Sequence, residues 1–420
     1  MIESTPMTEY NEKLVKYSVA RRFIIKLGIM AHSYGPSAAR LESYLTQVTE
    51  TLGYQGIFHS TRSEIMYVFW KDDPMVQTQH VEKVEKGAFN MAKLARVGEL
   101  VELVVAGEIS LEDAYTLLDK IDKLPDPWGP FAKAISFLLI GVGFAGLMTG
   151  NIWDILLAGG LALVVYINVY IAHQFHGRLI ELLPFSSAYI VGVLATFLKI
   201  FLPEINIQVV VLSSIIVLIP GFTVSAGIVE IVSDHVVSGS ANLIAGITYL
   251  LKQFFGAWFG LATVSIFLPA IQENTVLYTS LNLWNPWIFL PLLFIGLGVA
   301  YQSLMRDFPW VILCCLVSYF GVIFGNSFEI EYLGTLMGAI VANIFGNLWA
   351  RKFNRPTSIV LVPAITVMVS GSVGFQGLFI AATEETSKGL NQFLQMFIVA
   401  LVIAAGLLIA NTIVRPKVTL

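Results

Sequence analysis

A run of polar side chains follows a Pro-Gly pair inside a strongly apolar part of the chain. Residues 217–242 read VLIPGFTVSAGIVEIVSDHVVSGSAN and carry hydroxyl, carboxyl, imidazole and amide groups. Proline removes one backbone hydrogen bond from a helix and leaves a carbonyl free, and glycine lets a ligand approach the backbone closely. The candidate binding residues of this run are Pro220, Gly221, Thr223, Ser225, Glu230, Ser238 and Asn242.

These groups suit a ligand that carries an ammonium and a carboxylate together, as an amino acid does. A freed carbonyl and an acidic side chain could hold the ammonium. The N-terminus of a half-helix, hydroxyls or amide donors could hold the carboxylate. Because polar groups inside a membrane are costly, they need a functional reason. The segment therefore predicts a binding site for a small zwitterion.

Three titratable groups of the same run, Glu230, Asp234 and His235, could carry protons. On a continuous helix Glu230 and Asp234 are four residues apart on one face, with Thr223 on the same side. Two close carboxylates in a low dielectric cannot both ionise cheaply, so one would keep a proton. Together with His235 they could relay a proton that drives transport. The alternative is that residues 233–235 form a solvated turn.

A second apolar stretch, residues 360–377, repeats the start of the first. With Pro220 laid on Pro363, residues 217, 218, 223 and 224 recur as Val360, Leu361, Thr366 and Val367. Many transporters build a substrate site in lipid from such a duplicated, interrupted helix. This copy adds Pro363, Thr366 and Ser370 to the candidate binding residues. Chance matching in apolar sequence, or small residues that serve helix packing, are the alternatives.

We expect membrane helices to hold these groups in place. The chain has 420 residues, of which 56% are hydrophobic and 13% charged, and this is typical of a polytopic membrane protein. Residues 1–131 carry 14 Lys and Arg and 18 Asp and Glu, whereas the rest of the chain carries 11 of each kind. We therefore expect a cytoplasmic α+β domain over residues 1–131, followed by two membrane repeats of five helices over 132–272 and 273–420.

Ten apolar segments are long enough to cross about 30 Å of hydrocarbon, which needs about 20 residues each. They lie at residues 133–150, 152–172, 184–202, 207–232, 239–269, 286–304, 308–325, 331–350, 357–380 and 390–413. Because each half has an odd number of spans, the halves would be inverted relative to each other. Basic residues of the loops place both termini in the cytoplasm. The inside set is Arg178, Arg306, Arg351, Lys352, Arg355, Arg415 and Lys417, against Lys199 and Lys388 outside.

The polar N-terminal part reads as mixed helix and strand. Helices are expected at 11–30, 37–52, 79–106 (broken once) and 110–123, and a β-hairpin at 56–59 and 64–70. Residues 124–130, LPDPWGP, form a stiff linker that cannot continue a helix. This domain could gate the pathway or support a homo-oligomer, and the sequence leaves both open.

Several function classes are disfavoured by composition and motifs. The net charge of −4 gives no indication of nucleic-acid binding. Cys314 and Cys315 are adjacent in an apolar run and imply neither a disulfide framework nor a metal site. Residues 1–131 lack the phosphate-binding loop, nucleophile-elbow and zinc-protease motifs. We therefore expect no enzyme activity, no cofactor and no metal, and the polar N-terminus has no signal-peptide core.

The residues also resemble a known family. The N-terminal GPSAARLESYLTQVTETLG, the linker LPDPWGP and PGFTVSAGIVEIVSDHVVSGSANLIAG are similar to the threonine/serine exporter family, with two halves joined that are separate subunits in some relatives. The resemblance implies an exporter of small amino acids or, in the split relatives, of dicarboxylates, energised by an ion gradient. Asn242 stands where an arginine would be expected, which would make a dicarboxylate harder to bind. The second interruption reads Pro363-Ala364 instead of Pro-Gly.

We therefore expect a secondary-active exporter of threonine and serine in the cytoplasmic (inner) membrane, coupled to protons and in contact with membrane lipid. Export of succinate-like dicarboxylates is one alternative. A membrane-anchored sensor or intramembrane enzyme, whose cytoplasmic domain does the work, is an alternative of another class.

Overall fold

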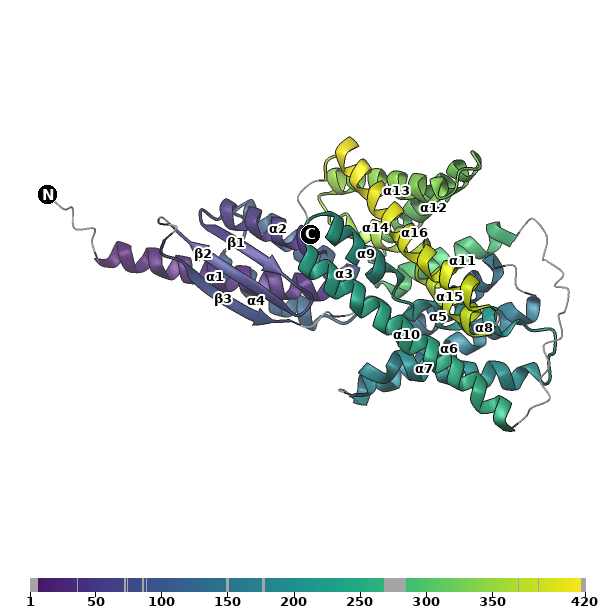
Figure 1. Ribbon diagram of the computed structural model, residues 1–420. Coiled ribbons are helices and arrows are strands. Elements are labelled where there is room, and N and C mark those ends of the chain that lie inside the picture. Colours follow the sequence, from purple (N-terminus) through teal and green to yellow (C-terminus); the bar gives the residue numbers. More distant parts are fainter. Residues whose placement is uncertain are drawn as a thin grey trace.

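The fold is seen in a computed structural model of the chain. It describes residues 7–35, 37–71, 73, 75–84, 87, 89–148, 151–175, 178–267, 285–368, 370–383 and 385–416. Figure 1 shows helices and strands of the N-terminal region (residues 7–123) at one end of the molecule and a bundle of helices at the other.

The N-terminal region consists of four helices and a small sheet, and the first two helices pack against the sheet. The helices are α1 (Met7–Tyr34), α2 (Ala38–Thr51), α3 (Met91–Val105) and α4 (Leu111–Lys123), and the strands are β1 (Gln55–Ser60), β2 (Glu64–Trp70) and β3 (Thr78–Lys83). The antiparallel strands lie in the order β1-β2-β3. Exposed and buried residues alternate along β1, so one face of the sheet, including Phe58, Tyr67 and Phe69, packs into the core with Phe23 and Leu27.

The predicted hairpin is confirmed, because β1 pairs with β2 from Gln55 opposite Trp70 to Ser60 opposite Ile65. The helix predicted for residues 79–106 is wrong in its first part. Residues 78–83 form β3 instead, since they complete the backbone hydrogen bonds of β2 and expose alternate side chains. The helical part begins only at Met91.

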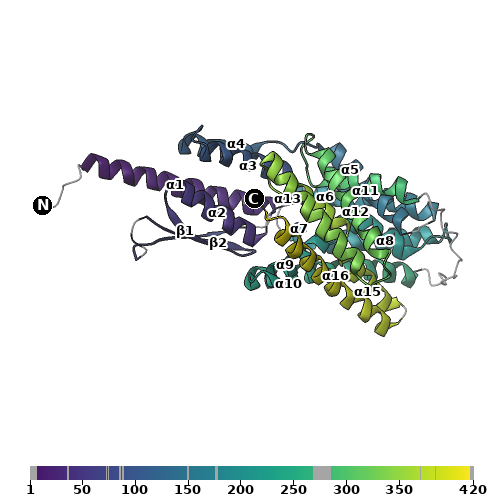
Figure 2. The ribbon, with the colours of Figure 1, turned by 90° about the horizontal axis from the view of Figure 1, so that it is seen from above.

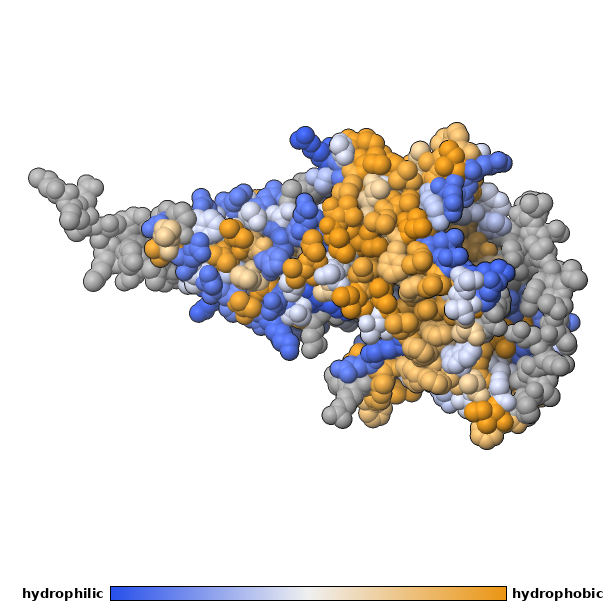
Figure 3. All heavy atoms as spheres, viewed as in Figure 1, coloured by the Kyte–Doolittle hydropathy of each residue, from blue (hydrophilic) through white to orange (hydrophobic). Residues whose placement is uncertain are grey.

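The remaining helices form the bundle. They are α5 (Pro130–Leu147), α6 (Ile152–Phe175), α7 (Arg178–Lys199), α8 (Ile207–Ile215), the 3₁₀ turn η1 (Ile216–Leu218), α9 (Gly221–Val232), α10 (Val236–Phe267), α11 (Asn285–Ala300), α12 (Phe308–Asn326), α13 (Leu333–Phe353), α14 (Ser358–Val367), α15 (Ser370–Thr383) and α16 (Thr386–Ile413). Figure 3 shows hydrophobic residues over most of the visible face of this bundle and hydrophilic residues over the N-terminal region.

The described residues contain eight helices that are long and apolar enough to cross a membrane, or nine when the bent pair formed by α8 with η1 and α9 is one span. The apolar α11, Asn285–Ala300, is shorter. Each of the ten predicted segments overlaps one of these helices or helix pairs. The chain is therefore a multi-pass membrane protein, and a count of ten crossings stays a prediction.

The two halves of the bundle repeat one pattern of contacts. Helix α6 packs on α8 as α12 packs on α14, and α10 packs on α7 and α9 as α16 packs on α13 and α15. Between the halves, α5 packs along α11. The predicted boundary at residues 272 and 273 lies outside the described residues.

The N-terminal region is docked on the ends of membrane helices. The amides of Met91 and Ala92, which begin α3, donate to the carbonyls of Tyr301 and Gln302, which follow α11. Glu99 of α3 forms ion pairs with Arg306 and Arg355. Figures 1 and 2 both show α2 and α3 at the border with the bundle. Because these contacts tie helix ends together, the N-terminal region is held in one orientation on the bundle.

Candidate functional site

The first interruption is a sharp bend at Pro220. Helix α8 tightens into η1, Ile219 takes an extended conformation with φ −67° and ψ 125°, and α9 restarts at Gly221. The helix axis bends by 59° between α8 with η1 and α9. A residue before proline is pushed out of the helical conformation, so Ile219-Pro220 is where the helix must break. The break lies midway along residues 207–232, as the Pro-Gly pair predicts.

The second interruption is not at Pro363-Ala364, contrary to the sequence prediction. Pro363 lies inside α14, which continues to Val367, and α15 begins at Ser370. Every residue from Ser358 to Ile365 is buried. A proline in a helix loses one hydrogen bond, and here the packing around α14 keeps the helix intact past it.

The two interruptions nevertheless touch each other. A Cβ placed on Gly371, in the first turn of α15, would lie 2.8 Å from the Cα of Gly221 and 2.8 Å from the Ile219 side chain. Real Cβ atoms essentially never come so close, so only glycine fits at this crossing. The two halves of the chain therefore meet backbone to backbone at their broken helices.

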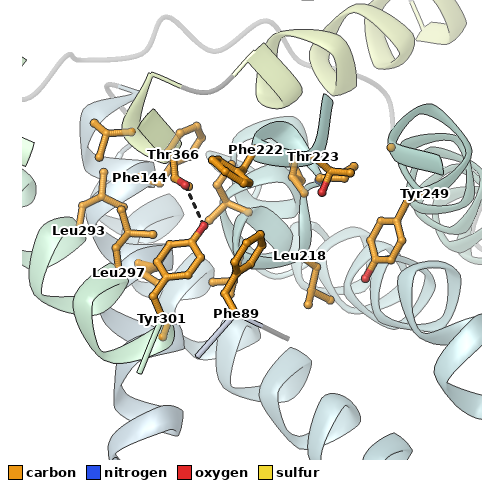
Figure 4. A pocket seen from close by; sticks show the side chains of 18 of the residues that line it. Phe89, Phe144, Leu218, Phe222, Thr223, Tyr249, Leu293, Leu297, Tyr301 and Thr366 are labelled. Atoms are coloured by element: carbon orange, nitrogen blue, oxygen red, sulfur yellow. Dashed lines mark hydrogen bonds between the residues drawn. The ribbon is translucent and has the colours of Figure 1, made fainter. Parts of the chain in front are cut away.

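Beside this crossing lies a cavity of about 380 Å³, which we call the central cavity. Its walls come from both halves and from the N-terminal region, and they are mostly apolar. The candidate residues Pro220, Thr223 and Thr366 line it. Figure 4 shows Thr223 and Tyr249 on one side of the cavity, with Thr366 and Tyr301 on the other. This size falls in the range of roughly 300–1,000 Å³ that is usual for small-molecule sites.

Three aromatic rings meet between these walls. The Phe89 ring lies 5.2 Å from that of Phe222 and 5.7 Å from that of Tyr301, edge to face in both cases. The Tyr301 hydroxyl is 2.8 Å from Thr366 Oγ1, which itself donates to the Val362 carbonyl, so the tyrosine donates to the threonine. Because Phe89 belongs to the loop before α3, the N-terminal region inserts a side chain into the central cavity.

Glu230 is buried, with 2% of its surface exposed, and it is fully engaged by the protein. One carboxylate oxygen accepts from the Ala38 amide at 2.9 Å. The other accepts from Ser238 Oγ at 2.9 Å and Asn242 Nδ2 at 2.8 Å. Ala38 begins α2, whose own N-cap Ser37 gives no side-chain hydrogen bond. Glu230 therefore caps a helix of the N-terminal region, as a negative charge at a helix N-terminus should.

Glu230 does not line the central cavity, but Asn242 connects it to a residue that does. Arg62, in the turn between β1 and β2, donates from Nη1 to Asn242 Oδ1 at 3.1 Å and lines the cavity. Burial lowers the pKa of Arg62 below its usual range. A guanidinium stays charged even so. Arg62 thus brings a cation of the N-terminal region beside Asn242.

The predicted stack of Glu230 and Asp234 is wrong. Helix α9 ends at Val232, and Asp234 takes a left-handed conformation with φ 66° in an exposed turn, so its side chain leaves the face of Glu230. His235 turns to the N-terminal region instead. Its Nε2 lies 3.1 Å from Glu42 Oε2 and its Nδ1 lies 2.8 Å from the Ser233 carbonyl. The relay of three neighbouring groups is therefore not assembled in this structure.

A second cavity of about 150 Å³ lies on the other side of Phe222. Ser225 lines this cavity and not the central one, and so does Arg40 of α2. Arg40 Nη1 lies 3.5 Å from Ser358 Oγ, and burial lowers the pKa of Arg40 to about 10. The side chain of the candidate Ser370 lies outside the described residues.

Sequence reasoning missed the residues that close the central cavity, which are Arg62, Phe89, Phe222, Tyr249 and Tyr301. Phe222 directly follows the Pro-Gly pair, and its position was the one available signal. Arg62 and Phe89 lie in short turns of the N-terminal region, where no periodicity marks them.

Apolar helices of spanning length define a multi-pass membrane protein, and the cavity at the bend in α8 and α9 is its candidate site. Comparison with protein families agrees with this class. The family model described as "Putative threonine/serine exporter" matches residues 22–264, and the model "Threonine/Serine exporter, ThrE" matches residues 287–413. The chain belongs to the threonine/serine exporter family, which is a family of exporters and not of enzymes.

Curated relatives share the name "Pheromone-regulated membrane protein 10". The protein from Kluyveromyces lactis is 26% identical over 88% of this chain and 39% of its own length. Those from Eremothecium gossypii and Saccharomyces cerevisiae are 24% and 23% identical, over 87% and 88% of this chain and 50% and 48% of their own lengths. This chain thus spans half or less of the length of these relatives. No solved structure matches it.

Proposed function

We propose that this protein is a secondary-active exporter that moves threonine and serine through the central cavity. The observation that carries the proposal is the position of this cavity at the meeting of two broken helices. One helix, α9, begins at the cavity, and two helical segments, η1 and α14, end at it. A site of this kind offers free backbone groups of both polarities to a ligand.

Those helix ends match a zwitterion. The last carbonyls of η1 and α14 have no partner within their own helices, and residues 216–218 and 366–367 line the cavity. They suit an ammonium group. The first amides of α9 likewise have no partner within their own helix, although that of Gly221 donates to the Ile219 carbonyl, and Phe222 and Thr223 also line the cavity. They suit a carboxylate, while the apolar remainder fits a small side chain.

Proton coupling is assigned to Glu230 through its hydrogen bonds. The carboxylate, Asn242 and Arg62 form a continuous chain that ends at the cavity. Protonation of Glu230 would remove its negative charge and turn one of its oxygens into a donor, which would weaken its hydrogen bonds to the Ala38 amide and to Asn242 and so loosen the N-terminal region from the bundle. His235 takes a secondary part, since it contacts Glu42 of the N-terminal region, and Asp234 is given no part.

Transport requires alternating access, and the repeated contact pattern of the halves supports a mechanism in which one half rocks against the other.

We propose ten spans in two inverted repeats, with both termini in the cytoplasm. The Arg415 carbonyl accepts from Arg351 at the end of α13, on the side where Arg355 pairs with Glu99. Basic residues gather on that side, as the positive-inside rule expects of the cytoplasm.

Exchange of radiolabelled threonine across liposomes that contain the purified protein tests the proposal. We expect unlabelled threonine and serine to drive exchange, and a Glu230→Gln variant to exchange without dependence on the proton gradient. Exchange of neither amino acid would overturn the proposed substrate. A Glu230→Gln variant with an unchanged response to the gradient would remove Glu230 from the coupling.

Succinate serves as the competing substrate in the same assay. A dicarboxylate has two negative groups, and Arg62 is the one charged residue among the described residues that line the cavity. We therefore expect succinate to compete poorly with threonine. Strong competition by succinate together with weak competition by serine would favour dicarboxylate export.

A further inference from the structure

Arg62 occupies a position that its protein contacts do not explain. Its guanidinium has five N–H donors, and the one hydrogen bond found for it among the described residues goes to Asn242. Within the described part of the chain no carboxylate lies within ion-pair distance of Arg62. Other arginines of the same border, Arg306 and Arg355, do have acidic partners.

Leaving a partly buried guanidinium without an anion is unfavourable, because burial removes water that would otherwise solvate the charge. The lowered pKa of Arg62 has this burial as its cause. The nearest acidic group in the network, Glu230, is reached only through Asn242, and its oxygens are already occupied by three donors. Because no other described residue takes up the remaining Arg62 donors, they are free to reach a ligand in the central cavity.

We infer that Arg62 is the carboxylate-recognising residue of the central cavity, so that the N-terminal region is part of the substrate site. This inference rests on the proposed function and adds the group that selects for a carboxylate. Arginine binds a carboxylate through two parallel N–H donors, which gives orientation as well as affinity. The ammonium end of the substrate then faces the helix ends at η1 and α14.

The competing explanation is that Arg62 only docks the β1–β2 turn on α10 through Asn242. The two explanations differ in how the substrate's carboxylate matters. A docking residue would affect every ligand of the cavity alike, whereas a recognition residue would affect only ligands with a carboxylate. L-serine and L-serinamide form the matched pair, because they differ only at that group.

The experiment measures how well each compound inhibits threonine exchange by the full-length protein in liposomes. We expect Arg62→Gln to weaken inhibition by L-serine about 10- to 100-fold, as for the loss of a charged hydrogen bond, and to leave inhibition by L-serinamide nearly unchanged. Arg62→Lys should weaken inhibition by L-serine less than Arg62→Gln does. Arg22→Gln, which changes an exposed arginine of α1, is the matched control and should behave as wild type.

A relocated charge distinguishes recognition from folding. The double variant Arg62→Gln with Asn242→Arg places a guanidinium at the residue that Arg62 contacts, and it should recover part of the preference for L-serine over L-serinamide. Equal loss for both compounds in Arg62→Gln, with no recovery in the double variant, would overturn the inference while leaving the proposed function intact. Absence of threonine exchange by the wild type would overturn both.

Discussion

The interruption at Pro220 and the interruption after Val367 lie against each other, but they are built differently. At Pro220 the helix bends by 59°, and Pro220 and Thr223 line the central cavity. In the second copy the proline lies inside a buried helix, the break follows several residues later, and the Thr366 hydroxyl is bonded to Tyr301 and to the Val362 carbonyl.

This difference indicates a division of labour between the two copies. A proline breaks or bends a helix where the surroundings leave room, whereas the packing around α14 keeps it helical through Pro363. The first interruption has the room and keeps free groups, so we assign it substrate contact. The second is packed around Pro363 and supports the first interruption, and it offers the substrate only the carbonyls at the end of α14.

The largest expected effect is at the crossing of the two interruptions. Gly371→Val would push side-chain atoms into the backbone of Gly221, and overpacking of this kind costs about 1–3 kcal/mol or more. We expect a lower unfolding temperature and loss of threonine exchange. Gly160→Val is the control, because a Cβ on Gly160 meets nothing within 4 Å. A Gly371→Val variant with normal stability and exchange would show that the halves do not meet here.

The two prolines give the next comparison. Pro220→Ala should slow threonine exchange by at least about tenfold, because it removes the roughly 3 kcal/mol by which proline disfavours a straight helix. Pro363→Ala should stay close to wild type, since α14 is already helical at that residue. Exchange rates of the two variants in liposomes check this. A larger defect in Pro363→Ala would reverse the roles that we assign to the two copies.

The matched threonines should give a smaller and more selective effect. For the described residues the structure shows no hydrogen bond to the Thr223 hydroxyl, so we expect Thr223→Val to raise the half-saturating threonine concentration about 5- to 10-fold, the usual value of one hydrogen bond. Thr366→Val instead leaves the Tyr301 hydroxyl without its acceptor and should mainly lower the unfolding temperature. Equal changes in half-saturation for both would contradict the division.

The smallest effect is expected at the edge of the N-terminal region. His235 and Glu42 are 27% and 16% exposed, and such a pair contributes about 1 kcal/mol or less. Limited proteolysis should therefore cut His235→Ala at nearly the wild-type rate. Glu230→Ala, which removes the cap of α2 and leaves buried donors unpaired, should be cut faster. Similar rates for the two variants would show that Glu230 does not hold the N-terminal region.

Much of the fold could be predicted from the sequence because its signals are local. Runs of apolar residues mark the membrane helices, and the Pro-Gly pair at 220 and 221 marks the bend, since proline acts on its own turn. Glu230 was recognised for the same reason, as a charge in an apolar stretch. Pro363 shows the limit of such signals, because the packing around α14 outweighs the local preference of the proline.

The parts that could not be predicted depend on contacts between segments far apart in the chain. Arg62 and Phe89 reach the cavity only because α2 and α3 dock on the ends of the bundle. The predicted stacking of Glu230 and Asp234 is wrong for a related reason. Its spacing assumed a continuous helix, whereas α9 ends at Val232 so that the chain can turn into α10.

The most direct test of the account asks whether the substrate occupies the central cavity. Ala245→Cys places a thiol in the cavity wall, while Cys314 and Cys315 are buried on α12 and Met75→Cys provides an exposed control. We predict that L-threonine slows labelling of Cys at 245 by a water-soluble thiol reagent and leaves labelling at 75 unchanged. If saturating threonine does not slow labelling at residue 245 in liposomes that still exchange threonine, the account is contradicted.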